Sequence, residues 1–492
     1  MKSFSRTIGN LFLAYLFPTF QDAFFIGALF AVSVQGSMLI NADGDIGRHI
    51  TIGNYIAQHW QIPTSDIFSH TMYGQRLVPH EWLAQWIFSR FHAWMGLNGV
   101  VAVTTILIAT AFTLVYREIR KRGSHTLVAL TVASLAGLAS SLHWIARPHV
   151  FTFVFVALWT YLLADKKSKV WVFPVIMLVW VNTHGAFITG FAIWLAHLAG
   201  WLWDYTHKQA DRTHGLRLAV IGVSSFAVTF INPSGWHLWS TSAGYYGNPF
   251  LVNATIEYLS PNFHNWSTWP FLLMLAICLA GIGLKTKMQT YEGFLLAGWT
   301  ILSLYSARNI PLFAIVTAPY VATIIQENLP QIPILQRIET SNNSVEKKHK
   351  GILIPLLSVG VLLATSVLLK GRIPANNFDP NKFPVQAVDW LESNPQEGEM
   401  FNNFIWGGYI LYRMFPQELV FIDGQTDFYG EEFTLEYAKV VKLEDGWQDV
   451  LTTYDVSWVI VESYRPLIPA LQDELNWKVI YQDDTATILH KP

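Results

Sequence analysis

The stretch Asn41-Ala-Asp43-Gly-Asp45-Ile-Gly-Arg48-His49 directly follows the first long apolar run of the chain, residues 22–40. It places two carboxylates two residues apart, followed by a guanidinium and an imidazole. Such a cluster at a membrane surface is costly unless it is hydrated, paired or metal-bound, so it marks a candidate functional site. A simpler alternative is that one of the two aspartates caps a helix that begins at Ile46. Capping needs only one aspartate and leaves the arginine and the histidine unexplained.

The composition around this stretch indicates a polytopic membrane protein. Of the 492 residues, 52% are hydrophobic and only 13% are charged, whereas a soluble domain is about one quarter charged. The net charge of -2 gives no indication of a nucleic-acid partner. The chain has a single cysteine, Cys278, so no disulfide can form within it.

Hydropathy predicts about eleven spans, because apolar runs of membrane-spanning length recur along the chain. Their approximate positions are 22–41, 97–116, 126–144, 150–165, 170–183, 186–204, 216–232, 267–285, 290–306, 309–326 and 351–370.

Five basic connections fix the orientation of these spans. With eleven spans, all five fall on the side of the amino terminus, which the positive-inside rule makes cytoplasmic. They are residues 117–122, 166–169, 208–217, 285–287 and 346–350. The opposite, outer side receives the loop that begins at Asn41.

Polar residues recur at the outer ends of several spans. A single residue of this kind is usually a snorkelling or capping side chain. Sets from separate spans at one depth predict a shared wet cavity that opens outward. They are Arg147, His149, Asn182, His184, Glu257 and Arg308.

Three parts of the chain are predicted. Residues 1–21 form an interfacial amphipathic helix, and residues 22–370 form the transmembrane domain. The first outer loop, 42–96, contains helices at 46–60 and 82–94 and a turn that ends at Asp66. Residues 371–492 form an α/β domain outside the cytoplasm, because helical and extended patterns alternate. Its expected helices are 384–392, 407–414 and 467–475, and its expected extended segments are 400–404, 419–422, 456–461, 479–480 and 485–489.

This plan resembles the GT-C superfamily of membrane glycosyltransferases. Bacterial members of the superfamily have counterparts of two motifs in this chain, Asp45-x-Gly-x-His-x-x-x-Gly53 and Pro63-x-x-Asp66. The superfamily carries an acidic residue just after the first span, as Asp43 and Asp45 do, and a second polar pair before a surface helix, as His80-Glu81 do. Trp406-Gly-Gly-Tyr409-Ile410 and Phe421-Ile-Asp423-Gly-x-Thr426 resemble the catalytic subunit of oligosaccharyltransferase. That subunit reads an acceptor sequon with Trp-Trp-Asp-Tyr-Gly. The aspartate is missing here, so the resemblance implies a similar fold rather than sequon recognition.

The resemblance implies transfer of a sugar or glycan from a polyprenyl-(pyro)phosphate donor to a glycan, lipid or protein acceptor, in the bacterial cytoplasmic membrane among its lipids. Asp43 or Asp45 is the expected catalytic base, because a carboxylate can accept the proton of the incoming hydroxyl. Asp-x-Asp also suits a divalent cation, Mg or Mn, and that option stays open. The expected substrate-binding residues are Arg48, His49, His80, Glu81, Arg147, His149, Asn182, His184, Glu257, Arg308, Tyr409 and Asp423.

Two alternatives remain from the residues alone. A transporter or flippase of an amphiphilic lipid also places polar groups near a cavity, although it favours midplane sites and internal repeats. An inactive scaffold would keep the fold without the chemistry. For Asp423, which ends an expected strand before Gly424, a role in a turn is the alternative to contact with the acceptor.

Overall fold

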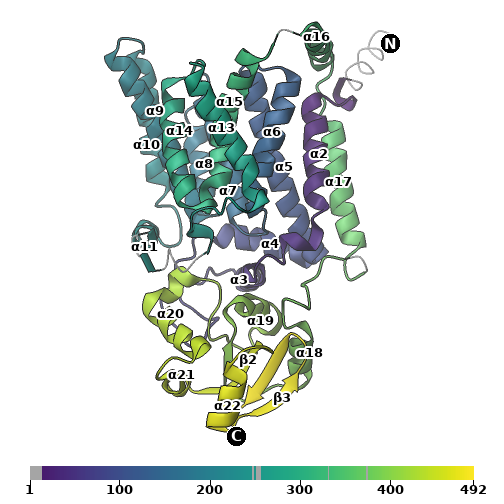
Figure 1. The fold of residues 1–492 in the computed structure, drawn as a ribbon, viewed down its shortest axis with the longest axis vertical. Coiled ribbons are helices and arrows are strands. Elements are labelled where there is room, and N and C mark those ends of the chain that lie inside the picture. The colour runs from purple at the N-terminus through teal and green to yellow at the C-terminus, as the bar shows by residue number, and fades with distance from the viewer. Residues whose placement is uncertain (1–13, 247–248, 251–255, 331, 373–374) are drawn as a thin grey trace.

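A helical bundle stands above a smaller carboxy-terminal part with a four-stranded sheet (Figure 1). The computed structural model describes all residues except 1–13, 247–248, 251–255, 331 and 373–374, so the predicted helix at 1–21 lies largely outside the described residues. The helices before the carboxy-terminal part are α2 (Phe20–Ser33), α3 (Asp45–His59), α4 (Trp82–Met95), α5 (Leu97–Lys121), α6 (Thr126–Ser140), α7 (His149–Leu163), α8 (Val172–Val181), α9 (Ile188–Thr206), α10 (Arg212–Val228), α11 (His237–Tyr246), α13 (Trp269–Gly283), α14 (Thr290–Tyr305), α15 (Ile310–Asn328), α16 (Pro333–Lys348) and α17 (Leu353–Leu368).

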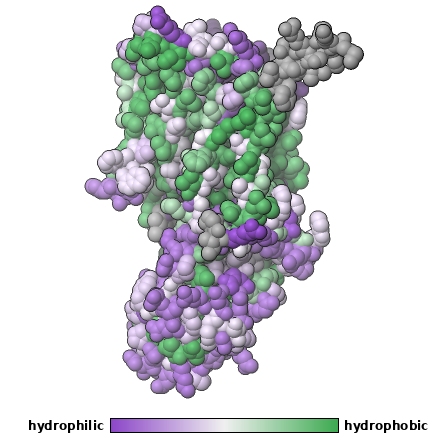
Figure 2. All heavy atoms as spheres, turned by 90° about the vertical axis from the view of Figure 1, so that its right-hand side faces the viewer, coloured by the Kyte–Doolittle hydropathy of each residue, from purple (hydrophilic) through white to green (hydrophobic). Residues whose placement is uncertain are grey.

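The membrane class is supported, whereas the count of eleven spans is not confirmed. Each predicted span overlaps a helix, and Figure 2 shows a mostly hydrophobic bundle surface above a mostly hydrophilic carboxy-terminal part. Within the described residues, six helices are long and apolar enough to cross a membrane, or seven if α16 and α17 form one bent span. Helix α7 has 15 residues, so it is only about 22 Å long against a hydrocarbon core of about 30 Å.

The two helices predicted in the first outer loop are confirmed as α3 and α4, which lie across the lower end of the bundle (Figure 1). The N-cap residue of α3 is Gly44, and it makes no side-chain capping bond. Asp43 instead accepts a hydrogen bond from the backbone N–H of Asp45 (3.0 Å). Neither aspartate is the N-cap residue, so the capping alternative does not account for the pair.

The carboxy-terminal part contains a mixed sheet in the order β1-β2-β4-β3, in which only the β1–β2 pair is parallel. Most expected elements are present, but the helices α20 and α21 were missed. The elements are α18 (Val385–Ser393), β1 (Glu399–Asn402), α19 (Gly407–Met414), α20 (Thr426–Lys442), α21 (Trp447–Thr453), β2 (Val456–Glu462), α22 (Leu467–Leu475), β3 (Lys478–Gln482) and β4 (Ala486–His490). The domain boundary at residue 371 stays a prediction.

The segment predicted as a strand at 419–422 is not a strand of the sheet; Val420 forms an isolated parallel β-bridge with Ser69 of the outer loop. The segment is apolar and buried, as expected of a strand, but its backbone bonds elsewhere. Val420 exchanges hydrogen bonds with Phe68 and His70 of the outer loop, and the N–H of Phe421 donates to the side chain of Asn402 (2.8 Å). This segment therefore joins the outer loop to the carboxy-terminal part.

Glycines allow the outer loop and the carboxy-terminal part to pack closely. A Cβ on Gly47 of α3 would clash with the carbonyl oxygen of Gly408 in α19, and a Cβ on Gly408 would clash with that of Gly44. Gly408 of the Trp406 motif therefore serves this backbone contact, whereas Gly407 lies against the carbonyl oxygen of Ile422. We call Gly44, Gly47 and Gly408 the glycine contact.

The basic connections meet at the opposite end of the bundle. Arg120 pairs with Glu339 and Glu346, and Lys121 pairs with Asp165 (2.6 Å). Arg217 donates to the carbonyl oxygens of Asp165 and Ser168. These contacts join four of the five basic connections at one end, as the span count predicted.

Candidate functional site

Three carboxylates from two parts of the chain surround the guanidinium of Arg147, in the turn before α7. Its Nε lies 2.9 Å from Oδ2 of Asp43, and its Nη1 lies 3.2 Å from Oε1 of Glu257. Its Nη2 pairs with Asp45. All four side chains are between 20% and 27% exposed. The structure thus brings four predicted site residues together in a partly exposed cluster, in which Oδ2 of Asp43 and Nε of Arg147 are themselves buried.

The pKa values of two carboxylates in this cluster, Asp43 and Glu257, are shifted in opposite directions. Burial raises the pKa of Asp43 to about 6; Arg147 opposes this shift and Asp45 adds to it. Burial also disfavours the charged form of Glu257, but Arg147 and Arg308 outweigh it and hold the pKa of Glu257 at about 2. Because proton transfer is most efficient when the pKa is near the working pH, Asp43 is the better-placed base.

Three histidines face the carboxylate of Glu81. Nδ1 of His49 lies 3.8 Å from Oε2, and Nε2 of His184 and of His80 lie 3.7 and 3.9 Å from Oε1. Burial raises the pKa of Glu81 and, with nearby cations, lowers the pKa values of His49 and His184. Both directions favour uncharged groups. This second cluster offers hydrogen-bonding groups rather than charges.

His149 and Arg308 lie beside these clusters. The His149 ring is 6.4 Å from that of His184 between centroids, and its Nε2 is 2.8 Å from the carbonyl oxygen of His143. Arg308 donates from Nη1 to the hydroxyl of Tyr258 (2.6 Å), and Tyr258 directly follows Glu257. The predicted convergence therefore extends to the start of α15.

Arg48 and Asp423 form a buried ion pair, with Nε and Oδ2 3.0 Å apart. Asp423 also accepts from the N–H of Gln425 (2.9 Å), and Arg48 donates to the Gln425 side chain. A Cβ on Gly424 would clash with Oδ1 of Asp45. Asp423 thus has the turn role, and we assign Arg48 and Asp423 as positioning residues that hold this turn against the loop of Asp43 and Asp45.

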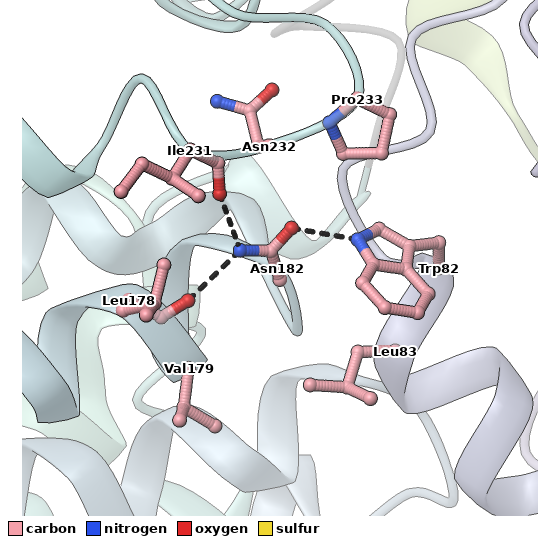
Figure 3. A pocket seen from close by; sticks show the side chains of 8 residues that line it. All are labelled: Trp82, Leu83, Leu178, Val179, Asn182, Ile231, Asn232 and Pro233. Atoms are coloured by element: carbon pink, nitrogen blue, oxygen red, sulfur yellow. Dashed lines mark hydrogen bonds between the residues drawn. The ribbon is translucent and has the colours of Figure 1, made fainter.

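Asn182 borders an apolar hollow of about 500 Å³ but is used structurally (Figure 3). Its side-chain N–H groups donate to the carbonyl oxygens of Leu178 and Ile231, and its oxygen accepts from the indole of Trp82 (2.7 Å). Two residues that line the hollow are close in sequence to the cluster around Glu81. Trp82 directly follows Glu81, and Asn182 precedes His184 by two residues.

Tyr409 is not brought to the site. It is 1% exposed and packs against Phe378 and Phe383, and its hydroxyl accepts from Arg413 (2.8 Å). Its place in the Trp-Gly-Gly motif reflects packing of the carboxy-terminal part rather than contact with substrate.

Two supporting residues were not predicted. Gln85 lies 3.2 Å from Nδ1 of His49, and the hydroxyl of Thr152 lies 2.9 Å from Nδ1 of His184. Gln85 is four residues after Glu81, so helical spacing could have revealed it. Thr152 lies in an apolar span without any such pattern, and only the fold shows its role.

The residues as placed do not form a divalent-cation site. Across the described residues, no group of three or more His, Cys, Asp or Glu side chains is arranged to hold a metal ion. Asp43 and Asp45 both direct Oδ2 to Arg147, which supplies the positive charge between them. The option of Mg or Mn stays a prediction, and no step below passes through a metal.

The comparisons with known proteins identify the class of fold. No family model matches the chain, and no curated protein matches it in sequence. Solved structures do match: the fold is that of the GT-C glycosyltransferases, which confirms the resemblance seen in the sequence.

Two of these structures are informative. The archaeal oligosaccharyltransferase AglB from Archaeoglobus fulgidus, in complex with an inhibitory peptide and a dolichol-phosphate, matches with a TM-score of 0.62 and 14% identity, covering 90% of this chain and 69% of AglB. ArnT from Cupriavidus metallidurans, in the apo state, matches with a TM-score of 0.51 and 14% identity, covering 95% of this chain and 97% of ArnT. Identities this low establish the fold and leave the substrates to be argued from the site.

Proposed function

We propose that the chain is an integral-membrane glycosyltransferase that moves a sugar or glycan from a polyprenyl-(pyro)phosphate donor to an acceptor on the outer face of the membrane. The observation that carries this proposal is the cluster of Asp43, Asp45 and Glu257 around Arg147, which joins a titratable base to a phosphate-binding guanidinium. The match to AglB, whose structure holds a dolichol-phosphate, supports a lipid-phosphate donor.

In the proposed reaction, Asp43 accepts the proton of the acceptor nucleophile. A bond forms from the acceptor atom to the anomeric carbon of the sugar, and the bond from that carbon to the phosphate oxygen breaks. The electron pair leaves with the phosphate. Arg147 and Arg308 stabilise the negative charge that develops there, because a guanidinium donates two parallel hydrogen bonds to phosphate. A phosphate that approaches Arg147 competes with Asp43 and so frees the base.

The apolar hollow shown in Figure 3 suits the first part of the isoprenoid chain. Apart from Asn182 and Asn232, it is lined by apolar or aromatic residues of α4, α8 and the segment after α10. Because Trp82 follows Glu81, a lipid in the hollow would bring its phosphate toward the polar clusters. This placement supports an amphiphilic donor over a soluble sugar nucleotide.

The orientation proposed from the sequence completes this scheme. The basic end of the bundle faces the cytoplasm of a bacterial cell, and the chain crosses the cytoplasmic membrane eleven times. The outer loop and residues 371–492 then lie on the extracytoplasmic side. The acceptor, a glycan, a lipid or a protein, would approach from there.

Release of polyprenyl phosphate from a polyprenyl-phosphate sugar tests the proposal. The purified protein is reconstituted in vesicles with this donor and with pooled cell-envelope acceptors, and the lipid product is measured by mass spectrometry. Wild type should release polyprenyl phosphate, and Asp43→Asn should slow release by about 10²–10⁴-fold, the usual cost of losing a general base.

Asp445→Asn is the matched control, because Asp445 is an exposed aspartate of the carboxy-terminal part. It should leave the rate unchanged. Transbilayer movement of the intact donor without release would favour a flippase instead. Equal rates for wild type and Asp43→Asn would reject this loop as the catalytic centre.

A further inference from the structure

A second cavity of about 500 Å³ lies at the basic end of the bundle, away from the candidate site. It is bordered by the end of α5, by the residues that begin α2, and by the elbow between α16 and α17. We propose that this cavity binds the phosphate group of an anionic membrane lipid.

Four cations border the cavity, and three carboxylates pair with two of them, since Lys121 pairs with Asp165 (2.6 Å). Arg120 is neutralised by Glu339 and Glu346, at 2.8 and 2.9 Å. Among the residues that line the cavity, Glu346 is the one carboxylate, and its charge is already paired with that of Arg120.

Two further cations lie over aromatic rings instead. Arg117 is 5.6 Å from the centroid of Tyr161, and Nζ of Lys350 is 5.3 Å from that of Tyr15. Within the described residues, neither cation has a carboxylate within ion-pair distance. A phosphate between them would meet two donors whose charge is not balanced by the protein.

A buried polar atom points to the same ligand. Nδ1 of His349, which lines the cavity, is buried and has no hydrogen-bond partner in the described part of the chain. The hydroxyl of Tyr116 lies beside the carboxylate of Glu346 and already interacts with it. Buried polar atoms in native proteins normally have partners, and a phosphate oxygen would accept from Nδ1 of His349.

The surroundings favour a lipid over free phosphate. Helices α16 and α17 meet at 79°, and the cavity lies at this elbow. Beyond it, α17 exposes Leu356, Leu357 and Val361, each about 60% exposed. Figure 2, which faces the side where α2 and α17 lie, shows hydrophobic residues below a hydrophilic upper end. The cavity therefore suits a headgroup, and the adjoining helix face suits acyl chains.

Lipid binding to the purified full-length protein tests this inference. After removal of bound lipid in detergent, phosphatidylglycerol, phosphatidylethanolamine or inorganic phosphate is added, and lipid adducts are counted by native mass spectrometry while unfolding is followed on heating. Phosphatidylglycerol should remain bound and raise the unfolding temperature by several degrees. Equal effects of phosphatidylethanolamine, or a full effect of inorganic phosphate, would overturn the proposal.

Variants locate the effect in the cavity. The double variant Arg117→Gln/Lys350→Gln should bind phosphatidylglycerol roughly thirtyfold more weakly, given about one kcal/mol for each cation near an anionic lipid. Lys167→Gln/Lys169→Gln removes two exposed lysines from a neighbouring basic connection and should bind like wild type. Unchanged binding by the first variant, or an equal loss in the second, would contradict the assignment.

Discussion

Both ends of the bundle hold an arginine between carboxylates, but the two clusters are built differently. At the basic end, Arg122 pairs with Glu118 of α5 and Glu292 of α14, whose side chains are 5% and 9% exposed. At the other end, the carboxylates around Arg147 are 20% to 27% exposed, and all three lie at or near the start of a helix or in a short turn.

This difference separates a structural cluster from a candidate site. Two carboxylates sealed between helices cannot exchange their arginine for a ligand without moving those helices. Three carboxylates at the rim of a bundle can do so, because their side chains are partly exposed to solvent. Ion pairing alone therefore says little about function, whereas access and a perturbed pKa together mark the outer cluster.

Among the variants at the two ends of the bundle, the largest expected effect is the loss of turnover rate in Arg147→Gln. Losing a preorganised cation at the leaving phosphate should lower the turnover rate by at least 10²–10³-fold. The carboxylates it leaves are partly hydrated, so the unfolding temperature should change little. Arg147→Lys keeps the charge without the planar fork and should lie between wild type and Arg147→Gln. Full activity in Arg147→Gln would remove the distinction between the two clusters.

The corresponding substitution in the cluster at the basic end is Arg122→Gln. It leaves Glu118 and Glu292 buried without their cation, which should cost roughly 3 kcal/mol of stability. Thermal unfolding in detergent should show a lower midpoint, while the rate per folded molecule stays within about twofold of wild type. A large loss of rate at unchanged stability would assign this cluster a functional role.

A smaller effect is expected at the glycine contact that supports the outer cluster. Gly47→Ala forces a methyl group into the carbonyl oxygen of Gly408 and should cost about 1–3 kcal/mol. Gly298→Ala in α14 is the control, because nothing lies within 4 Å of its Cβ position. If both variants unfold at the wild-type temperature, the close approach of α3 and α19 is wrong.

The smallest expected effect is the pH dependence of the outer cluster. Asp43 must be ionised to act as a base, and its pKa is about 6. The rate should therefore increase as the pH rises through 6, and it should be about tenfold lower at pH 5 than at pH 7. Initial rates of donor turnover across this range give the inflection. Because Arg147 lowers the pKa of Asp43, residual activity in Arg147→Gln should have its inflection at higher pH; a flat profile in wild type would exclude Asp43.

The sequence predicts helices well where one environment surrounds a whole segment. All eleven apolar runs and both outer helices coincide with helices, because backbone groups in an apolar setting bond within the segment. The predicted number of membrane crossings is not confirmed, because the length of helices such as α7 does not show whether they cross the membrane.

Prediction fails where distant segments exchange bonds. The run 419–422 has the composition of a strand, yet its partners are Phe68, His70 and Asn402. Likewise, the polar residues of the site were identified from their span ends, but pairing of Arg48 with Asp423 requires the carboxy-terminal part to be in place. Local pattern contains no information about such partners.

The bonds of Arg48 also set an order of events during synthesis. Its side chain donates to Gln425, 377 residues further along the chain. At about 5–20 residues per second, a ribosome needs roughly 20–75 s to make the intervening segment. Throughout that interval the nascent chain already carries the aspartates of the outer loop, yet lacks the turn that holds them. A chain that stalls or is cut before the final hundred residues therefore has the two aspartates but lacks Asp423 and Gln425, the partners of Arg48.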